Sequence, residues 1–262
     1  MRKKWFSILK LGITVISFLL VILAKSEIDW TNLSNNYINP VYVKEITYDL
    51  AIGIFSAMIL VWFIDEIGNQ LQERESVAKE KTAIKRFDRV LQKYIENYVL
   101  AFYCVATPID VRKFDDVVMP DAFTLKDMRD LHRTTLLINE KVSGGSVESF
   151  LQIEYDIRRE FISLIEKHEL EHFPQFAEIF LEFIDTSLSY DSRAAILDAP
   201  KTCPESFIRD LLENHADDYY QKILKGENIG GNLAHPYMFL YEMMKKERIL
   251  ILRYQEEINK LG

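Results

Sequence analysis

Two long apolar runs lie near the N-terminus, and the rest of the chain contains nothing like them. They cover residues 5–24 and 48–67, and each is long enough for a helix to cross the ~30 Å hydrocarbon core of a bilayer. Everything after Gly68 is rich in charge. The pattern therefore predicts a transmembrane helical hairpin in residues 1–68, followed by a separate domain in residues 69–262.

The charges around the first run predict the orientation of the chain. Arg2, Lys3 and Lys4 precede it, and basic residues are retained on the cytoplasmic side of a membrane. We therefore expect a multi-pass protein of the inner (plasma) membrane, with the N-terminus and the C-terminal domain in the cytoplasm. A cleaved signal peptide ending at Ala24 is the alternative for the first run, and it leaves the domain on the same side.

Periodic apolar positions predict that the C-terminal domain is helical throughout, so the expected fold class is all-α. Residues 69–83 are polar and resemble a solvated stalk, whereas an apolar stripe with helical spacing begins at Ile84. No alternating strand pattern exceeds a few residues. The expected helices cover residues 69–105, 124–142, 146–171, 174–189, 204–225 and 236–260.

Charge and cysteine content restrict the classes of partner. The net charge is −8, and residues 67–262 account for all of it, because residues 1–66 contain six basic and six acidic residues. An acidic domain argues against extensive nucleic-acid coating, which requires neutralisation of phosphates. Cys104 and Cys203 are the only cysteines, and in a reducing cytoplasm they are expected to be buried thiols.

The second apolar run contains features of a helix that packs against other helices in a membrane. Gly53 and Ala57 form a small-xxx-small pair, with Ser56 beside them, and such residues let helices approach closely in lipid. Acidic residues stand at both ends of the run. In a ring of subunits, Asp49, Asp65 and Glu66 would form acidic collars at the mouths of a pore. The alternative is a lone hairpin with acidic ends at the membrane interface.

A basic stretch follows the stalk and is a candidate binding site for a nucleotide or an oligonucleotide. Lys85, Arg89 and Lys93 recur every four residues on one helix face, and Arg86 is adjacent. Arginine and lysine side chains in such an array can bind phosphate groups. The alternative is a solvated helix flank that is paired with nearby glutamates.

Residues 168–172 read H-E-L-E-H and are similar to the H-E-x-x-H signature of zinc metallopeptidases. On a helix, His168 and His172 would share a face and could bind zinc, with Glu169 as the general base. The charge of Glu171 departs from the usual pattern, and Phe173-Pro174 predicts that the helix ends there. Zinc is thus a candidate cofactor, no other cofactor is expected, and the alternative is an exposed helix end with two solvated histidines.

A second enzyme pattern lies between Arg209 and His215. It is similar to the R-(polar)-x4-H signature of HEPN ribonucleases, with Asp210 at the polar position. The resemblance implies an all-helical fold in which the arginine and the histidine handle the scissile phosphate and proton transfer at a dimer interface. An amphipathic helix with Arg209 and Asp210 on its wet face explains the same residues.

The layout of the whole chain, two apolar runs before an all-helical domain, resembles that of bacterial two-span membrane effectors of anti-phage defence, the Hailong-type channels among them. This resemblance implies a homo-oligomer in the lipid bilayer that forms a ligand-gated pore or ion channel under the control of its cytoplasmic domain. A membrane-tethered enzyme, either a ribonuclease or a zinc hydrolase, is the main alternative. A structural scaffold is a third.

Overall fold

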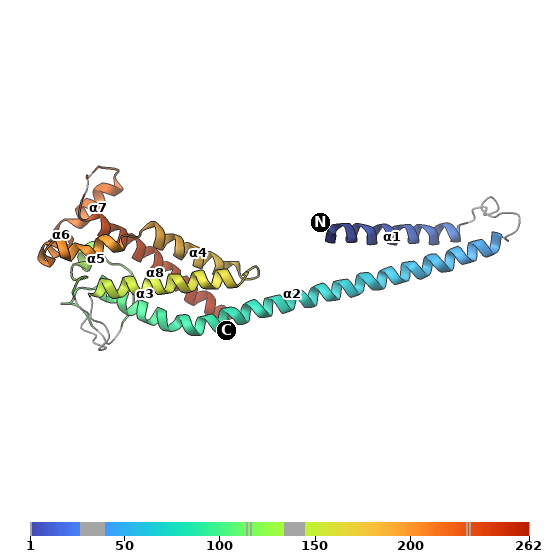
Figure 1. The fold of residues 1–262 in the computed structure, drawn as a ribbon, viewed down its shortest axis with the longest axis horizontal. Helices are drawn as coiled ribbons and strands as arrows, with labels where there is room; N and C mark the ends of the chain where they lie inside the picture. The colour runs from blue at the N-terminus through green and yellow to red at the C-terminus, as the bar shows by residue number, and fades with distance from the viewer. Residues whose placement is uncertain are drawn as a thin grey trace. The chain divides into compact units, whose positions relative to one another are not determined.

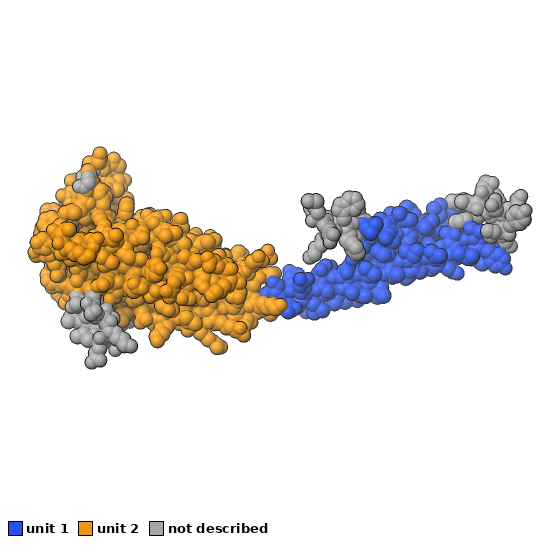
Figure 2. Space-filling view, in the orientation of Figure 1, with its two compact units in different colours: residues 1–76 blue, residues 77–262 orange. Residues whose placement is uncertain are grey.

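The computed structural model describes residues 2–26, 40–113, 115, 117–133, 145–228, 230 and 232–261, and every regular element in them is helical. The elements are α1 (Arg2–Lys25), α2 (Pro40–Ala106), the 3-10 helix η2 (Leu125–Met128), α3 (Ser146–Lys167), α4 (Pro174–Ser189), α5 (Arg193–Thr202), α6 (Glu205–Asn214), α7 (Ala216–Leu224) and α8 (His235–Leu261) (Figure 1). The chain divides into two compact units, residues 1–76 and 77–262 (Figure 2). The division falls after Ser76 rather than after Gly68, inside α2.

Unit 1 consists of α1 and the first part of α2, which contact each other in antiparallel fashion. The rings of Phe18 and Phe55 lie 5.4 Å apart, and Lys10 forms an ion pair with Asp65. The lower-numbered residue of α1 contacts the higher-numbered residue of α2, so the two helices are antiparallel. Small residues allow the close approach, because Ser17, Ala24 and Ala51 are the buried side chains described in this unit.

Most apolar side chains of unit 1 are exposed. Within the described residues, the helix Val41–Ala106 is long and apolar enough to cross a membrane, and its apolar segment is almost wholly unburied within the protein. Leu60, Phe63 and Ile64 are each more than half exposed. An apolar surface of this kind is typical of a segment that faces lipid or another protein.

Unit 2 is built around a bundle of four helices, namely α2 from residue 77 onward, α3, α4 and α8. The ring of Phe87 on α2 lies 6.2 Å from that of Phe161 on α3, and Tyr98 lies 5.2 Å from Phe150. These two pairs show that α2 and α3 are antiparallel. Gly145 precedes α3 at a place that only glycine fits, because a Cβ there would lie 2.6 Å from the carbonyl oxygen of His132.

Helices α4 and α8 complete the bundle. Phe180 on α4 stacks on Phe161 with ring centroids 4.5 Å apart, and the ring of Tyr254 on α8 lies 5.9 Å from those of Phe176 and Phe180. The Tyr254 hydroxyl donates to Asp88 on α2 across 2.8 Å. Helix α4 thus contacts α3 and α8, and α2 contacts the same two helices.

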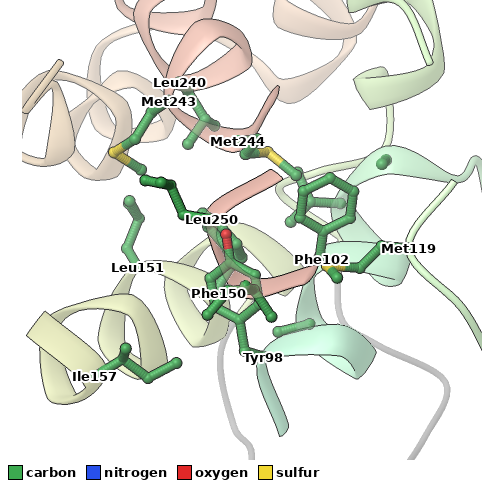
Figure 3. Packing of buried hydrophobic residues seen from close by; sticks show 14 of the residues in the cluster. Tyr98, Phe102, Met119, Phe150, Leu151, Ile157, Leu240, Met243, Met244 and Leu250 are labelled. Atoms are coloured by element: carbon green, nitrogen blue, oxygen red, sulfur yellow. The ribbon is translucent and has the colours of Figure 1, made fainter. Parts of the chain in front are cut away.

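Aromatic and aliphatic side chains from these helices form one continuous core. Figure 3 shows Tyr98 and Phe102 of α2, Phe150 of α3 and Met244 and Leu250 of α8 gathered around a common centre. Each of these is at least 95% buried. Burial of large apolar side chains is the dominant stabilising contribution in a domain of this size.

Two of the expected helices are not continuous α-helices in the structure. Residues 124–142 are not one α-helix, because the described part contains only η2 and turns up to Arg133, and residues 134–142 lie outside the described residues. The carbonyl oxygens of Leu131 and Arg133 accept from the amides of Val147 and Ser146 at 2.9 Å. These carbonyls therefore pair with α3 and not with the next turn of their own segment.

The expected helix 204–225 is divided into α6 and α7 at His215. The backbone of His215 leaves the helical region with φ −129° and ψ −30°, which allows α6 and α7 both to contact η2. Helix α5 lies between the expected helices 174–189 and 204–225 and was not predicted; Pro200 is close to its C-terminal end, and Ile196 is fully buried. The expected helices 174–189 and 236–260 match α4 and α8 closely, and the expected helix 69–105 is the later part of α2, which is continuous from Pro40 to Ala106.

Candidate functional site

Four of the predicted pore residues, namely Asp49, Gly53, Ser56 and Ala57, lie on the side of α2 that faces away from α1. Ala51 is buried against α1, and at 100° per residue Gly53, Ala57 and Asp49 point in roughly the opposite direction. All three are exposed, as is Ser56. A Cβ added at Gly53 would meet no atom within 4 Å. Contacts within unit 1 therefore leave this face of α2 open.

The acidic residues at the end of the second apolar run have partners within unit 1. Asp65 forms an ion pair with Lys10 of α1, and Glu66 accepts a hydrogen bond of 2.9 Å from Gln70. The charge of Asp65 is therefore compensated where the run ends. Of the three predicted collar residues, Asp49 lies at the other end, exposed on the open face.

The basic residues predicted to bind a ligand form one exposed stripe on α2 in unit 2. We call Lys85, Arg86, Arg89 and Lys93 the basic stripe. All four are exposed, and among the residues that the structure describes none of them has an ion-pair partner within 4.0 Å. The expected pairing with nearby glutamates therefore does not occur in the described part of the chain.

The sequence analysis did not identify a second charged stripe, which lies on α4. Glu178, Glu182 and Asp185 are exposed on one face of this helix, and we call them the acidic stripe. Arg253 of α8 lies 3.5 Å from Glu178 and 2.9 Å from Glu182. Arg253 thus pairs with two of the three carboxylates, so the stripe keeps a negative charge. The three- and four-residue spacing of these acids was the signal available in the sequence.

Arg209, the predicted ribonuclease arginine, lines an open cleft of about 310 Å³ on α6. The cleft is lined by Arg133, Glu205, Ser206, Arg209, Asp210 and Glu213. The side chains of Arg209 and Arg133 both point to the buried carboxylate of Asp130, at 3.6 Å and 3.7 Å. Because carboxylates outnumber guanidinium groups around this cleft, its electrostatic potential disfavours a phosphate.

His215 does not join Arg209 in lining the cleft. It lies at the junction of α6 and α7, exposed, with its Nε2 atom 3.9 Å from Asp210. A ribonuclease site of this type places both side chains on one phosphate. The HEPN-like activity remains a prediction, and within one chain the two residues are not gathered in the same cleft.

The helical geometry expected for His168 and His172 is wrong. Helix α3 ends at Lys167, and His168 is extended, with φ −137° and ψ 125°. The ring of His172 instead contacts Glu80 of α2, with 2.8 Å between Nδ1 and Oε1, and its backbone amide donates to Oε2 of Glu80 at 3.0 Å. The described residues contain no group of three potential ligands placed to hold a metal ion.

A buried polar cluster, which the sequence analysis missed, connects α3, α4 and α5. The hydroxyl of Ser187 donates to Glu154, Arg158 donates to Ser187 at 2.9 Å, and Arg193 donates to Glu154 at 2.7 Å. Glu154 is 1% exposed. Burial raises the pKa of Glu154, while the Ser187 hydrogen bond and the two arginines oppose that rise.

Glu247 of α8 is a second carboxylate in the core, and it is fully buried. One of its oxygens accepts from the Tyr98 hydroxyl at 2.8 Å, and the other has no hydrogen-bond partner among the described residues. Burial, followed by the nearby charge of Glu154, raises the pKa of Glu247 well above its usual range. Both glutamates occupy positions in the apolar stripes of their helices, which was a readable signal in the sequence.

The two cysteines are free thiols in different environments. Cys104 is buried on α2, as expected, and burial raises the pKa of its thiol. Cys203 is only partly buried and lines an apolar cavity of about 140 Å³ with Phe207, Leu233 and Tyr237 among its neighbours. This cavity presents no converging polar groups for catalysis.

The described side chains thus offer an open small-residue face on α2 in unit 1 and two charged stripes on unit 2, but no assembled catalytic group. Comparison with family models, with curated proteins and with solved structures finds no match for this chain.

Proposed function

We propose that this chain is a subunit of an oligomeric membrane channel whose opening is controlled by its helical C-terminal domain. In this proposal α1 and the first part of α2 cross the membrane as a hairpin, with unit 2 in the cytoplasm. The open face of α2 supports it most directly. Asp49, Gly53, Ser56 and Ala57 lie opposite the side that α1 covers, so a neighbouring subunit can approach α2 there.

The chemistry of this face fits a contact between helices in lipid. Small residues lower the distance of closest approach between helix backbones, and Ser56 can donate a hydrogen bond across the contact. An exposed carboxylate at the end of an apolar helix is costly in lipid unless it faces water or a partner. Asp49 on the open face therefore favours a water-filled mouth in an assembly of several chains.

A regulatory role for unit 2 is consistent with its lack of an assembled catalytic site among the described residues. Its buried polar cluster and aromatic core make a stable bundle, while its charged stripes offer surfaces to other molecules. The layout that resembles defence effectors makes phage infection the setting in which we expect the channel to open.

The experiment is a mass measurement and a flux assay on the full chain. In detergent, the wild-type protein should have the mass of an oligomer, and in liposomes it should conduct ions. A Cβ at Gly53 meets no atom of its own chain within 4 Å, so Gly53→Leu enlarges the open face, and subunit mass and ion flux should fall together. A wild-type protein that is a clean monomer and does not conduct would end the proposal.

Gly12→Leu is the matched control. Gly12 also lies on a helix of unit 1, and a Cβ there likewise meets no atom within 4 Å, but it belongs to α1 and not to the open face of α2. Gly12→Leu should keep both the oligomer mass and the flux. If the two variants behave alike, Gly53 has no special place in the assembly.

A further inference from the structure

The basic stripe of α2 and the acidic stripe of α4 lie on opposite sides of unit 2. Helices α2 and α4 each contact α3 and α8, so they occupy diagonal corners of the bundle. Figure 1 shows α3 and α8 lying between them. Because the two stripes point outward in opposite directions, they cannot neutralise each other within one chain.

The two stripes also lie at the same level along the bundle. Helices α2 and α4 both run antiparallel to α3, so they are parallel to each other. Phe87 of α2 approaches Phe180 of α4 with ring centroids 6.0 Å apart, and Glu80 contacts His172 just before α4. In both pairs the α4-side residue is numbered 92 or 93 higher than its α2 partner.

This register aligns the charges of the two stripes one by one. The same numerical offset puts Lys85 level with Glu178, and Arg89 level with Glu182. Lys93 falls within one residue of the level of Asp185. The contacts through α3 agree, because Phe161 touches both Phe87 and Phe180. The basic stripe and the acidic stripe therefore have matching spacing and face outward from opposite sides of one domain.

Exposed apolar side chains accompany both stripes. Val90 is 52% exposed beside Arg89 on α2, while Leu181 and Leu188 are 55% and 60% exposed beside the acidic stripe. A specific protein contact needs apolar area at its centre as well as polar groups at its rim. Each face of the bundle thus carries the two components of a helix-to-helix interface.

We propose that unit 2 associates head to tail with a second copy of this chain, with the basic stripe of one subunit against the acidic stripe of its neighbour. The proposal rests on the channel function above, in which several copies share one membrane. Copies inserted with the same topology are related by rotation about the membrane normal. Such a rotation brings two different faces of the subunit together, and it closes a ring when the angle between neighbours divides a full turn.

A second copy fits the basic stripe better than a free phosphate ligand does. The stripe lies along one helix face, and none of its residues lines the cavity at Cys203, the cleft at Arg209 or the hollow beside Phe123 and Arg248. A ligand site of that kind would leave the matching acidic stripe unexplained. A contact between the two stripes of neighbouring subunits makes use of their matching register.

Charge reversal on each helix tests this contact in the full chain. The α2 variant is Arg89→Glu with Lys93→Glu, the α4 variant is Glu182→Lys with Asp185→Lys, and the combined variant keeps the net charge of −8. The change at Glu182 removes only a surface ion pair with Arg253, and exposed pairs of this kind contribute little to folding. Circular dichroism of each variant should therefore match that of the wild type.

The readout is the subunit mass in detergent at low and high salt. Each single-helix variant should dissociate at least about tenfold more readily than the wild type, because like charges then face each other. The combined variant should regain the wild-type mass, and so should an equal mixture of the two single-helix variants. About 0.5 M salt should weaken the wild-type contact and the restored ones, since screening shortens the range of these charges.

Two exposed lysines outside the four-helix bundle provide the matched control. Lys113→Glu with Lys126→Glu changes the charge by the same amount as the α2 variant, away from both stripes, and should keep the oligomer mass. If the α2 variant dissociates while the α4 variant does not, the basic stripe serves another anionic partner and the proposal is overturned. If the wild type is oligomeric and neither variant changes its mass, this interface is wrong while the channel proposal stands.

Discussion

Removal of Arg193 should destabilise unit 2, because the buried carboxylate of Glu154 loses the guanidinium that donates directly to it. Arg193 donates to Glu154 at 2.7 Å, and Glu154 is 1% exposed. Breaking a buried ion pair by deleting one partner costs about 3–5 kcal/mol. Because Arg193 itself is partly exposed, we expect Arg193→Ala to cost about 3 kcal/mol, the lower end of that range.

For a domain the size of unit 2, each kcal/mol lowers the thermal midpoint by about 2–4 °C. Arg193→Ala should therefore lower the midpoint of the full chain in detergent by about 6–12 °C, measured by circular dichroism at 222 nm. Arg159→Ala is the matched control, because Arg159 is mostly exposed and makes only surface ion pairs of 3.7–3.8 Å. Its cost should stay within about 0.5 kcal/mol.

The loss of unfolding free energy in Arg193→Ala should also depend on pH. Burial raises the pKa of Glu154, and Arg193 is one of the groups that oppose this rise, so its removal raises the pKa further. Between the unfolded and the folded pKa the folded state binds more protons, so its stability increases as pH falls. The stability difference between the wild type and Arg193→Ala should therefore become smaller as the pH falls from about 8 to about 5.

A second variant separates charge from packing. Glu154→Gln with Arg193→Ala removes the buried carboxylate charge, while Arg158 keeps its hydrogen bond to Ser187, so the double variant should be more stable than Arg193→Ala alone at neutral pH. An unchanged midpoint for Arg193→Ala, or a deficit that is the same at every pH, would refute the reasoning. In either case the buried cluster would not depend on the charge of Glu154.

Three further variants or measurements test other parts of the domain. Phe161→Ala should cost about 3–5 kcal/mol of unfolding free energy because it leaves a cavity in the aromatic core, whereas Ile162→Ala on the outer face should cost less than about 1 kcal/mol. Glu80→Ala removes a charged hydrogen-bond acceptor that contributes about 1.5 kcal/mol. Hydrogen exchange at the His172 amide should therefore accelerate about tenfold, and an unchanged exchange rate would show that this hydrogen bond does not form. Elemental analysis should find no stoichiometric zinc, and a zinc ion lost equally in His168→Ala and His172→Ala would contradict this.

Local patterns in the sequence were sufficient for most of the helical layout. Helical periodicity depends on neighbouring residues alone, so the apolar stripe from Ile84 predicted the part of α2 that lies in unit 2, and α4 and α8 were located almost to the residue. The two apolar runs were evident for the same reason. The expected membrane segment of α2 is indeed long, apolar and exposed.

Local patterns were insufficient where distant segments compete for the same backbone groups. Residues 124–133 look helical, but the start of α3 takes the carbonyls of Leu131 and Arg133. The H-E-x-x-H motif looks like a helical metal site, but the chain leaves α3 at His168, and Glu80 binds His172. These outcomes depend on residues far away in the chain, which no local window contains.

The candidate sites divide in the same way. The sequence alone predicted that the residues of the basic stripe share one helix face. It predicted the same for the small residues of the second apolar run, because both groupings depend only on helical spacing. Only the tertiary structure decided that α1 covers the side of α2 opposite Gly53, and that Phe87 aligns α2 with α4. That alignment sets the basic and acidic stripes level on opposite sides of the bundle, since packing between distant aromatic residues determines the register of the two helices.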